Sequence, residues 1–371
     1  MPDKVKVLLI GQTPPPYSGQ ALMLERLVHT RFARLEVHHV RMAFSASVQS
    51  IGRFEMQKVA HLVQVIWRAL VLRFRRGVQV LVFPPAGPRW NPVLRDIALL
   101  LVLRPFFRKT VFTFQAAGVS EFLESRPKLV RRLAMWAYGR PDGAIHLSRL
   151  LPPDAEYFRA KRVVVIPNGI EDTAPPYIQK ERPAEGTVRI LYVGFIDERK
   201  GAMALLEAVS TLARTGLNFA VTFIGEFTSK AFEQRARRFC EEHGLDDRIS
   251  FVGQRLGDEK WEQFHRADIL CMPSHFESEA LPLVVIEAMM FQLPVVATRW
   301  RGIPDLIDDG VSGYLVPIRD PQALADALSR LISDSTLRRT MGANARRRYL
   351  DQFTIERYLQ RTEDFLLEFA E

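Results

Sequence analysis

The sequence is poor in cysteine and lacks several common enzyme signatures. Cys240 and Cys271 are the two cysteines in 371 residues, too few for a disulfide framework or a cysteine-rich zinc site. No Gly-x-Gly-x-x-Gly and no Gly-x4-Gly-Lys-Ser/Thr occurs, which disfavours a dinucleotide-dependent dehydrogenase and a P-loop enzyme. Asp-x-Asp, a usual carboxylate clamp for a metal-bound diphosphate, is also absent.

Long hydrophobic runs are missing as well. The longest uncharged apolar run is Ile97–Leu103, far below the roughly 20 residues that cross a bilayer. Met1–Ile10 is too short for the apolar core of a signal peptide. With so few cysteines, these features predict a cytoplasmic protein that meets a membrane only at its surface.

Acidic residues are scarce in the front half of the chain. Residues 1–178 carry 26 Lys and Arg against 12 Asp and Glu, a balance of +14. Residues 179–371 carry 25 against 30, a balance of −5. This asymmetry suggests that the halves meet different partners, and the basic half could face nucleic acid, anionic lipid or an acidic substrate.

Short apolar runs bounded by turn residues recur along the chain, and many lack polar alternation, as parallel strands buried on both faces do. Twelve such runs are predicted strands: Val5–Ile10, Val37–Val40, Val78–Phe83, Thr110–Phe114, Ala144–Leu147, Val163–Ile166, Val188–Val193, Phe219–Ile224, Ile249–Val252, Ile269–Met272, Pro294–Ala297 and Tyr314–Val316.

Stretches with helical spacing separate most of these runs, which predicts α/β domains with parallel sheets. The proline-containing segment Glu171–Thr187 has no apolar run and is interpreted as a linker. We therefore expect one domain over 1–175, a second over 186–350, and a helix over 351–371 that returns to the first. Ligands of open α/β sheets bind beyond the carboxyl ends of the strands, so a cleft between the domains is the expected site.

The strongest motif follows the predicted strand Ile269–Met272. Pro282 suits the first position of a helix, and the N–H groups of Leu283 and Val284 would then be available to a phosphate. Glu279 would precede this helix, and Glu287 would lie about one turn inside it, within reach of ribose hydroxyls. Acidic residues near a helix start are also simply favourable there.

This Glu-x7-Glu pattern, in Glu-Ala-Leu-Pro-Leu-Val-Val-Ile-Glu-Ala-Met, resembles the signature of retaining glycosyltransferases of family 4. Further segments that match the family are Ile166–Ile170, Leu293–Thr298, Gly302–Ile307, Asp309-Gly310 and Gly313–Val316. The resemblance covers most of the back half. It implies two Rossmann-like domains facing across a cleft, the GT-B architecture, with a nucleotide-sugar donor and retention of anomeric configuration.

The resemblance also implies roles for individual residues. Glu287 would bind the ribose and Glu279 the donor sugar, while the backbone of Leu283 and Val284 would hold the diphosphate. Ala280 and Leu281 lie between these groups and belong to the same predicted substrate-binding segment.

A cation for the leaving diphosphate is expected after the strand Val188–Val193. The family usually has an Arg directly after the first Gly and a Lys before the next Gly. Lys200 matches the Lys, whereas Phe195 stands at the Arg position. Arg199 is a possible substitute, although both cations could be solvated surface charges. Because the sequence has no motif for a metal ion at the diphosphate, Lys200 and a helix N-terminus would supply the positive charge that a metal ion otherwise provides.

The front half resembles the family weakly. Gly19, in Gly-Gln-Thr-Pro-Pro-Pro-Tyr-Ser-Gly-Gln, stands where the family has a double glycine and would let a ligand approach the backbone, unless it only forms a turn. Gln115 stands where the family often has a His; it can bind a sugar hydroxyl but cannot titrate near neutral pH. His146 is interpreted as a core histidine.

A basic, aromatic surface is predicted in the front half. Val59–Arg76 has the pattern of a mostly apolar helix with a polar stripe at His61, Gln64 and Arg68, and the segment 104–109 mixes cations with aromatics. Anionic lipid attracts such clusters, although a covered helix with solvated ends fits equally. No segment resembles a nucleic-acid-binding module.

Together these features predict a metal-independent retaining glycosyltransferase without a cofactor. Its donor would be a nucleoside-diphosphate sugar and its acceptor a glycan or a lipid-linked glycan, as in the biosynthesis of cell-surface polysaccharide or glycolipid. A non-catalytic nucleotide-sugar-binding subunit and a nucleotide-sugar epimerase of similar fold remain alternatives.

Overall fold

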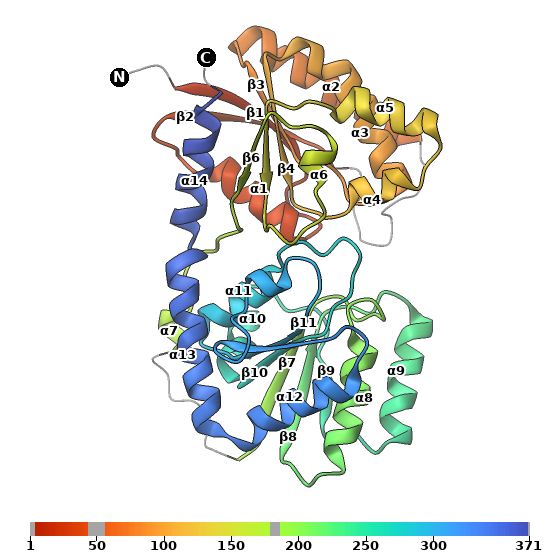
Figure 1. The fold of residues 1–371 in the computed structure, drawn as a ribbon, viewed down its shortest axis with the longest axis vertical. Helices are drawn as coiled ribbons and strands as arrows, with labels where there is room; N and C mark the ends of the chain where they lie inside the picture. The colour runs from red at the N-terminus through yellow and green to blue at the C-terminus, as the bar shows by residue number, and fades with distance from the viewer. Residues whose placement is uncertain (1–3, 44–55, 179–185, 370–371) are drawn as a thin grey trace. The chain divides into compact units, whose positions relative to one another are not determined.

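The computed structural model describes residues 4–43, 56–178 and 186–369. The chain divides into two compact units. Unit 1 comprises Met1–Asn168 and Glu356–Glu371, and unit 2 comprises Gly169–Ile355. Each unit is built on one parallel sheet (Figure 1).

The sheet of unit 1 has six strands in the order β2-β1-β3-β4-β5-β6. Every pair of neighbours is parallel. Parallel neighbours need crossover connections, and the helices between the strands supply them. The strands are β1 (Val5–Gly11), β2 (Leu35–Arg41), β3 (Val80–Phe83), β4 (Lys109–Phe114), β5 (Gly143–His146) and β6 (Arg162–Val165).

Three helices of unit 1, α2 (Met56–Arg76), α3 (Trp90–Leu103) and α5 (Lys128–Tyr138), pack side by side, with α3 in contact with both others. Their inward side chains share one core with β1, β3, β4 and β5. The remaining helices are α1 (Gly19–His29), η2 (Arg104–Phe106), α4 (Val119–Glu124) and α6 (Asp154–Tyr157).

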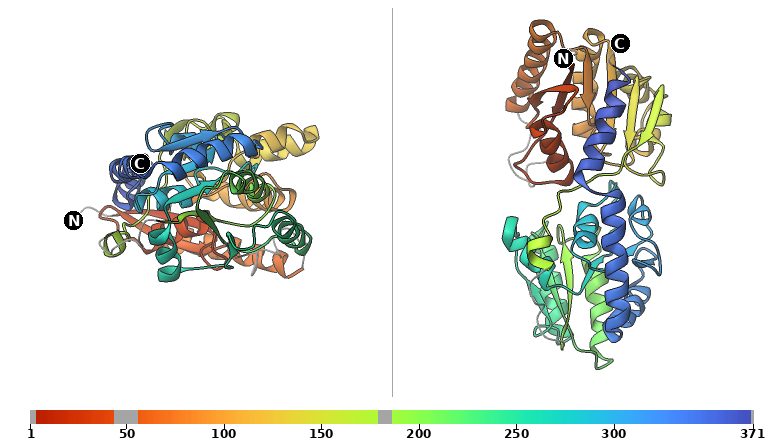
Figure 2. Two further views of the ribbon diagram at one scale, coloured as in Figure 1. Left: turned by 90° about the horizontal axis from the view of Figure 1, so that it is seen from below. Right: turned by 90° about the vertical axis from the view of Figure 1, so that its left-hand side faces the viewer.

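The last helix of the chain, α14 (Ile355–Leu367), covers the opposite face of this sheet. Ala144 faces the core under α2, α3 and α5, and successive strand residues point to opposite faces. A Cβ on the neighbouring Gly143 would lie 2.6 Å from the ring of Phe369, beyond the end of α14. A side chain at position 143 would therefore push that aromatic ring away from the strand. Figure 2 shows α14 running along unit 1.

The sheet of unit 2 also has six parallel strands, in the order β12-β11-β10-β7-β8-β9. The strands are β7 (Val188–Val193), β8 (Phe219–Ile224), β9 (Ile249–Phe251), β10 (Ile269–Met272), β11 (Val295–Thr298) and β12 (Gly313–Val316). The helices are α7 (Pro175–Ile178), α8 (Ala202–Ala213), α9 (Lys230–Glu242), α10 (Gly257–Arg266), α11 (Leu283–Met290), η3 (Ile303–Asp305), α12 (Pro321–Ser333) and α13 (Ser335–Gln352).

The predicted α/β fold class is confirmed, and each of the twelve apolar runs overlaps one strand. The runs lack alternation because helices cover both faces of the central strands, so that β3 and β10 are buried along their whole length. A strand buried on both faces favours apolar residues at every position.

Two segments near the unit boundary differ from the sequence interpretation. The predicted linker is ordered in its first part: Ala174 is buried, α7 follows it, and the Tyr177 hydroxyl donates to Asp258 at 2.9 Å. The rest of the linker, 179–185, lies outside the described residues. The helical tail is interrupted at Phe353, which is buried, so α14 begins at Ile355 rather than at 351.

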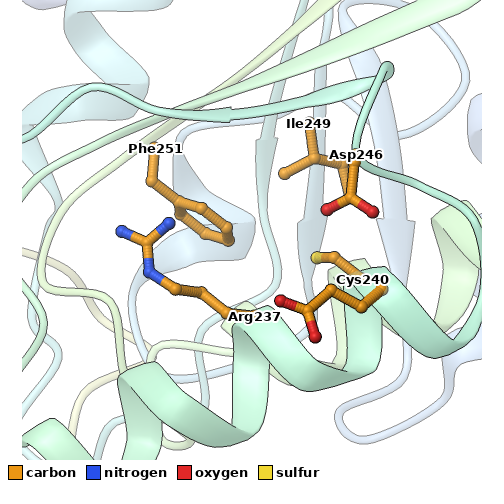
Figure 3. A pocket seen from close by; sticks show the side chains of 6 residues that line it. Arg237, Cys240, Asp246, Ile249 and Phe251 are labelled. Carbon is orange, nitrogen blue, oxygen red and sulfur yellow. The ribbon is translucent and has the colours of Figure 1, made fainter.

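Both cysteines are buried thiols in the core of unit 2. Cys240 lines a small pocket between α9 and β9, together with Arg237 and Asp246 (Figure 3). Burial raises the pKa of the Cys240 thiol to about 11 and raises the pKa of Cys271 as well. The thiolate is the nucleophile, so neither cysteine is poised for reaction near neutral pH.

We expect native protein at pH 8 to resist alkylation by iodoacetamide. The raised pKa of Cys240 leaves about a hundredfold less thiolate than an ordinary cysteine has, and Cys271 is inaccessible. Mass spectrometry should find both residues modified only after denaturation with urea. Labelling of either residue in the folded protein at the rate of a free thiol would contradict this expectation.

Candidate active site

The order of the strands in unit 2 creates a switch point between β7 and β10. The chain runs from β7 outward through β8 and β9, and then crosses back to place β10 on the other side of β7. The connections after β7 and β10 therefore leave the sheet in opposite directions at its carboxyl edge, which is the usual ligand position in open α/β sheets. The segments 194–200 and 273–282 border this position.

Lys200 and Glu279, one from each segment, form an ion pair at the switch point. The Lys200 Nζ atom lies 2.7 Å from Glu279 Oε2, and both side chains are largely buried. The Ser274 hydroxyl also donates to Glu279 Oε2, at 2.7 Å. The Glu279 carboxylate therefore receives two hydrogen bonds, one of them charge-assisted, which fixes its position.

Tyr192, near the end of β7, binds the backbone of the segment that carries Lys200. The Tyr192 hydroxyl donates to the carbonyl of Phe195 at 2.7 Å and lies 3.3 Å from that of Lys200. Burial raises the pKa of Tyr192 well above its ordinary value. This phenol therefore stays protonated and acts as a hydrogen-bond donor.

Gly201 allows the two segments to meet. Its backbone has φ +77°, a left-handed conformation that favours glycine. A Cβ built on it would lie 2.0 Å from the carbonyl oxygen of Pro273, which leads into the second segment. Any side chain at this position would push the second segment away from Lys200.

Arg199 and Lys200 converge on one aromatic ring, although neighbouring side chains usually diverge. The Arg199 guanidinium carbon lies 5.1 Å from the centroid of the Phe276 ring, and Lys200 Nζ lies 4.8 Å from it. Arg199 is 46% exposed and pairs with Asp197 at 3.3 Å. The predicted cations therefore do lie together, with Lys200 on the buried side and Arg199 toward solvent.

The helix α11 begins one residue later than the sequence predicts. Pro282 is the N-cap residue, with ψ 120°, and Leu283 is the first helical residue. The carbonyl of Pro282 accepts a hydrogen bond from the Val285 N–H at 3.2 Å. The N–H groups of Leu283 and Val284 belong to the first turn, which has no helical acceptors for them. Ala280 and Leu281, just before the cap, are both buried.

Glu287 lies in the second turn of α11 and is paired with a lysine that the sequence analysis missed. Lys260 Nζ, from α10, lies 2.6 Å from Glu287 Oε1, and side-chain exposures are 17% and 8%. The Lys260 ammonium also lies 4.8 Å from the centroid of the Trp261 ring. Lys260 has no motif around it in the sequence, and only the packing of α10 against its neighbours brings it to Glu287.

The two unit 1 candidates lie at the carboxyl edge of that unit's own sheet. Gly19 is exposed and opens α1, and the preceding Ser18 caps the helix by accepting a hydrogen bond from the Ala21 N–H at 3.2 Å. Gln115 is half-buried directly after β4. The Arg41 guanidinium donates to three carbonyls of the proline loop before Gly19, the closest being that of Pro15 at 2.9 Å.

The Gln115 segment is fixed by Asp154, a second residue that the sequence analysis missed. The buried Asp154 carboxylate accepts hydrogen bonds from the N–H groups of Gly118 and Ser120, at 3.0 and 2.8 Å. His146 is a core residue as predicted: it accepts a hydrogen bond from the Ala155 N–H at 3.1 Å, and burial lowers its pKa.

Comparisons with known proteins identify the family. The model of the family described as glycosyl transferases group 1 matches residues 174–348. The amylovoran biosynthesis glycosyltransferase AmsK of Erwinia amylovora is 31% identical over 290 residues, which is 76% of this chain and 67% of AmsK. The chain belongs to the group 1 glycosyltransferases.

This glycosyltransferase also resembles a second curated protein over part of its length and a solved structure over nearly all of it. D-inositol 3-phosphate glycosyltransferase of Paenarthrobacter aurescens is 32% identical over 215 residues, which is 54% of this chain and 52% of that protein. The solved structure of Anabaena HepE in complex with UDP is 19% identical, with a TM-score of 0.74 over 98% of this chain and 100% of that one. This likeness confirms the GT-B fold.

Over 4–43, 56–178 and 186–369, no group of three or more His, Cys, Asp or Glu side chains is arranged to hold a metal ion. Within the same ranges, every helix is too short or too polar to cross a bilayer.

We expect Lys260→Met to lower the free energy of unfolding of unit 2 by about 1–3 kcal/mol, because it leaves the buried Glu287 carboxylate without its partner. Urea denaturation at neutral pH measures this loss. The matched control is Lys230→Met, at the exposed start of α9, which should stay within about 0.5 kcal/mol.

The double variant Lys260→Met/Glu287→Met should recover much of the loss, since it removes both charges from the pair. A Lys260→Met protein as stable as the control would show that the pair contributes nothing to folding.

Proposed function

We propose that this glycosyltransferase transfers a sugar from a nucleoside-diphosphate sugar with retention of anomeric configuration and without a metal ion. The observation that carries the proposal is the Lys200–Glu279 pair at the switch point of unit 2, directly ahead of the N-terminus of α11. In this proposal, the cation, the carboxylate and the amides at the start of α11 surround the donor diphosphate. The HepE structures, which hold UDP and UDP-glucose, support a donor of this class.

In this proposal the diphosphate binds to the first turn of α11. The N–H groups of Leu283 and Val284 face it, and the helix end adds a partial positive charge. Lys200 neutralises the charge that develops on the leaving phosphate, so the ammonium exchanges part of its contact with Glu279 for the phosphate. Arg199, on the solvent side of Phe276, adds a second cation.

Glu287 accepts hydrogen bonds from the ribose hydroxyls. A carboxylate can accept two such bonds side by side, and Lys260 holds it in one orientation. Because these contacts are the same in the ground state and the transition state, they contribute to donor binding more than to the chemical step.

Glu279 orients the donor sugar and stabilises positive charge at the anomeric carbon. The bond between that carbon and the phosphate oxygen breaks while the acceptor oxygen bonds to the same face. The departing phosphate oxygen takes the proton of the acceptor hydroxyl, so no protein base is needed. Gln115 and the backbone at Gly19, in unit 1, are proposed to bind substrate hydroxyls.

We propose a glycan or lipid-linked glycan as the acceptor and the biosynthesis of a cell-surface polysaccharide or glycolipid as the setting. The relative named for amylovoran biosynthesis supports this setting. Donor identity can be determined by thermal-shift screening against a panel of nucleoside-diphosphate sugars.

We expect Glu279→Gln and Lys200→Ala each to lower kcat by about 10²–10³, as the loss of one preorganised charged group typically does. The measurement is donor hydrolysis or transfer, followed by release of the nucleoside diphosphate. Glu277→Gln, at an exposed position of the same segment, is the matched control and should keep wild-type turnover. Arg199→Ala should lose less than tenfold, because Arg199 is half-exposed and paired with Asp197.

Wild-type turnover by Lys200→Ala would remove Lys200 from the mechanism. Loss of turnover in EDTA, restored by added Mg²⁺ or Mn²⁺, would contradict the absence of a metal requirement. Inversion of the anomeric configuration, followed by NMR of the product, would contradict retention.

Glu287→Gln should raise the KM for the donor by about tenfold and leave kcat within a factor of about three, since uniform binding affects KM alone. Glu241→Gln, on the distant helix α9, is the control. An equal fall in kcat and kcat/KM would instead place Glu287 in transition-state stabilisation.

A further inference from the structure

Exposed apolar side chains of this protein concentrate on one part of unit 1. Of the sixteen exposed large apolar side chains among the described residues, eleven lie between 59 and 136. All eleven belong to α2, α3, η2 or α5. Single exposed apolar residues are ordinary on protein surfaces, whereas a concentration of this kind marks an interaction surface.

The apolar residues of α2 form a continuous outward stripe. Val59, Val63 and Trp67 follow at intervals of four, and Phe74 lies two turns beyond Trp67, so all four share one face. Val63, Trp67 and Phe74 are 62%, 63% and 65% exposed. The opposite side of the same helix packs into the core through Val65 and Ala69. A surface helix normally presents mainly polar residues outward, whereas α2 presents this apolar stripe beside its exposed Gln64 and Arg68.

The neighbouring helices α3 and α5 repeat this arrangement. Trp90, Leu94 and Leu101 lie on one face of α3 and are 40%, 46% and 38% exposed. On α5, Leu129 and Trp136 are two turns apart and are 67% and 73% exposed. Each helix therefore has an apolar stripe toward the core and a second one toward the outside.

The three stripes lie on one face of the sheet. The helix α3 contacts both α2 and α5, as Figure 1 shows. The Phe74 ring of α2 meets the Phe106 ring of η2 at 6.0 Å, and the Arg73 side chain donates to the Phe106 carbonyl at 2.6 Å. We call this continuous area of α2, α3, η2 and α5 the outer helix face.

The outer helix face is also cationic. Its four helices contain ten Lys and Arg residues and one acid, Asp96. Asp96 is fully buried and paired with Arg95 at 2.6 Å. Exposed cations such as Arg68, Arg75 and Arg132 therefore lie among the apolar stripes without an acid on these helices to offset them. At the edge, α4 adds two exposed acids, Glu121 and Glu124.

A hollow on α5 brings cations and aromatic side chains together in one place. It has a volume of about 310 Å³ and is lined by Lys128, Arg131, Arg132, Met135, Trp136 and Tyr157. Three cations beside two aromatic rings suit a phosphate group next to an apolar chain, because cations bind the phosphate and aromatic rings lie at the membrane interface.

We propose that the outer helix face docks this protein on a bilayer that contains anionic phospholipid. The aromatic and aliphatic stripes enter the boundary between headgroups and acyl chains, and the surrounding cations bind the lipid phosphates. This arrangement explains why the helices carry two apolar stripes: one packs on the sheet and the other enters the membrane.

The charge and the side-chain types of the outer helix face disfavour a second copy of this chain and nucleic acid as its binding partner. In a two-fold dimer the same patch meets itself, so the cations of one copy would face those of the other. Nucleic acid uses cations and aromatic stacking, but it offers no apolar phase for exposed aliphatic residues such as Val63, Leu101 and Leu129. An anionic bilayer satisfies both the cations and the aliphatic stripes.

Vesicle flotation tests the proposal with phosphatidylcholine vesicles that contain or lack phosphatidylglycerol. We expect the full chain to float with the anionic vesicles at low salt and not with the neutral ones. Trp67→Ser/Phe74→Ser should weaken binding at least tenfold, because it removes the most exposed aromatics of α2. Arg68→Gln/Arg75→Gln should weaken it about fivefold for each charge lost.

Matched controls test whether vesicle binding depends on the outer helix face itself or only on the number of charged and apolar residues on the surface. Arg357→Gln/Arg361→Gln removes two exposed charges from α14, on the opposite face of the sheet. Leu256→Ser/Leu350→Ser removes two exposed leucines from unit 2. Both control proteins should bind vesicles within twofold of wild type.

The proposal would be overturned if the protein did not float with anionic vesicles at low salt, or if the α14 control lost as much vesicle binding as Arg68→Gln/Arg75→Gln. Tighter binding to double-stranded DNA than to vesicles would also overturn it. So would a dimer, seen by light scattering, that Trp67→Ser/Phe74→Ser converts to monomer. The proposal does not rest on the donor chemistry. Stabilisation by UDP, measured by thermal shift on the same variants, should be unchanged, so failure of either proposal is recognised separately.

Discussion

The architecture of unit 2 is organised around one ion pair. Lys200 and Glu279 belong to connections that leave the sheet in opposite directions, and their charges meet in a largely dry position. Removing two charges from water is costly unless geometry and further hydrogen bonds offset it. Ser274 supplies a second donor to Glu279, Tyr192 holds the segment of Lys200, and Gly201 lets the two segments approach. Ser274, Tyr192 and Gly201 therefore position the Lys200–Glu279 pair.

A second pair, Glu287 with Lys260, repeats the arrangement farther along α11. Both acids of the Glu-x7-Glu pattern are thus neutralised by a lysine from another part of the chain. This matters for an anionic ligand. Two unpaired carboxylates would repel a diphosphate, whereas the paired ones leave the positive end of α11 as the dominant local field. In the proposed function, the two ion pairs and the helix end therefore act together on the diphosphate.

The apolar runs predict the strands well because each run is short and bounded by turns, and the central strands β3 and β10 are buried on both faces. The helix boundary at Pro282 is less predictable, since proline is tolerated both as a cap and as the first helical residue. The exposure of α2 is less predictable for a different reason. A membrane-facing helix and a covered helix fit its sequence equally, and only the positions of α3 and the sheet show that Trp67 and Phe74 are uncovered.

The sequence by itself determined the fold class, the parallel strands and the segment around Glu279 and Glu287, because these depend on local pattern and spacing. The tertiary structure decided which side chains meet. Lys260 reaches Glu287 from 27 positions away and Lys200 reaches Glu279 from 79. Such contacts depend on how helices and connections cross the sheet, which no local pattern encodes. Only the assembled unit therefore turns two glutamates in a motif into two ion pairs.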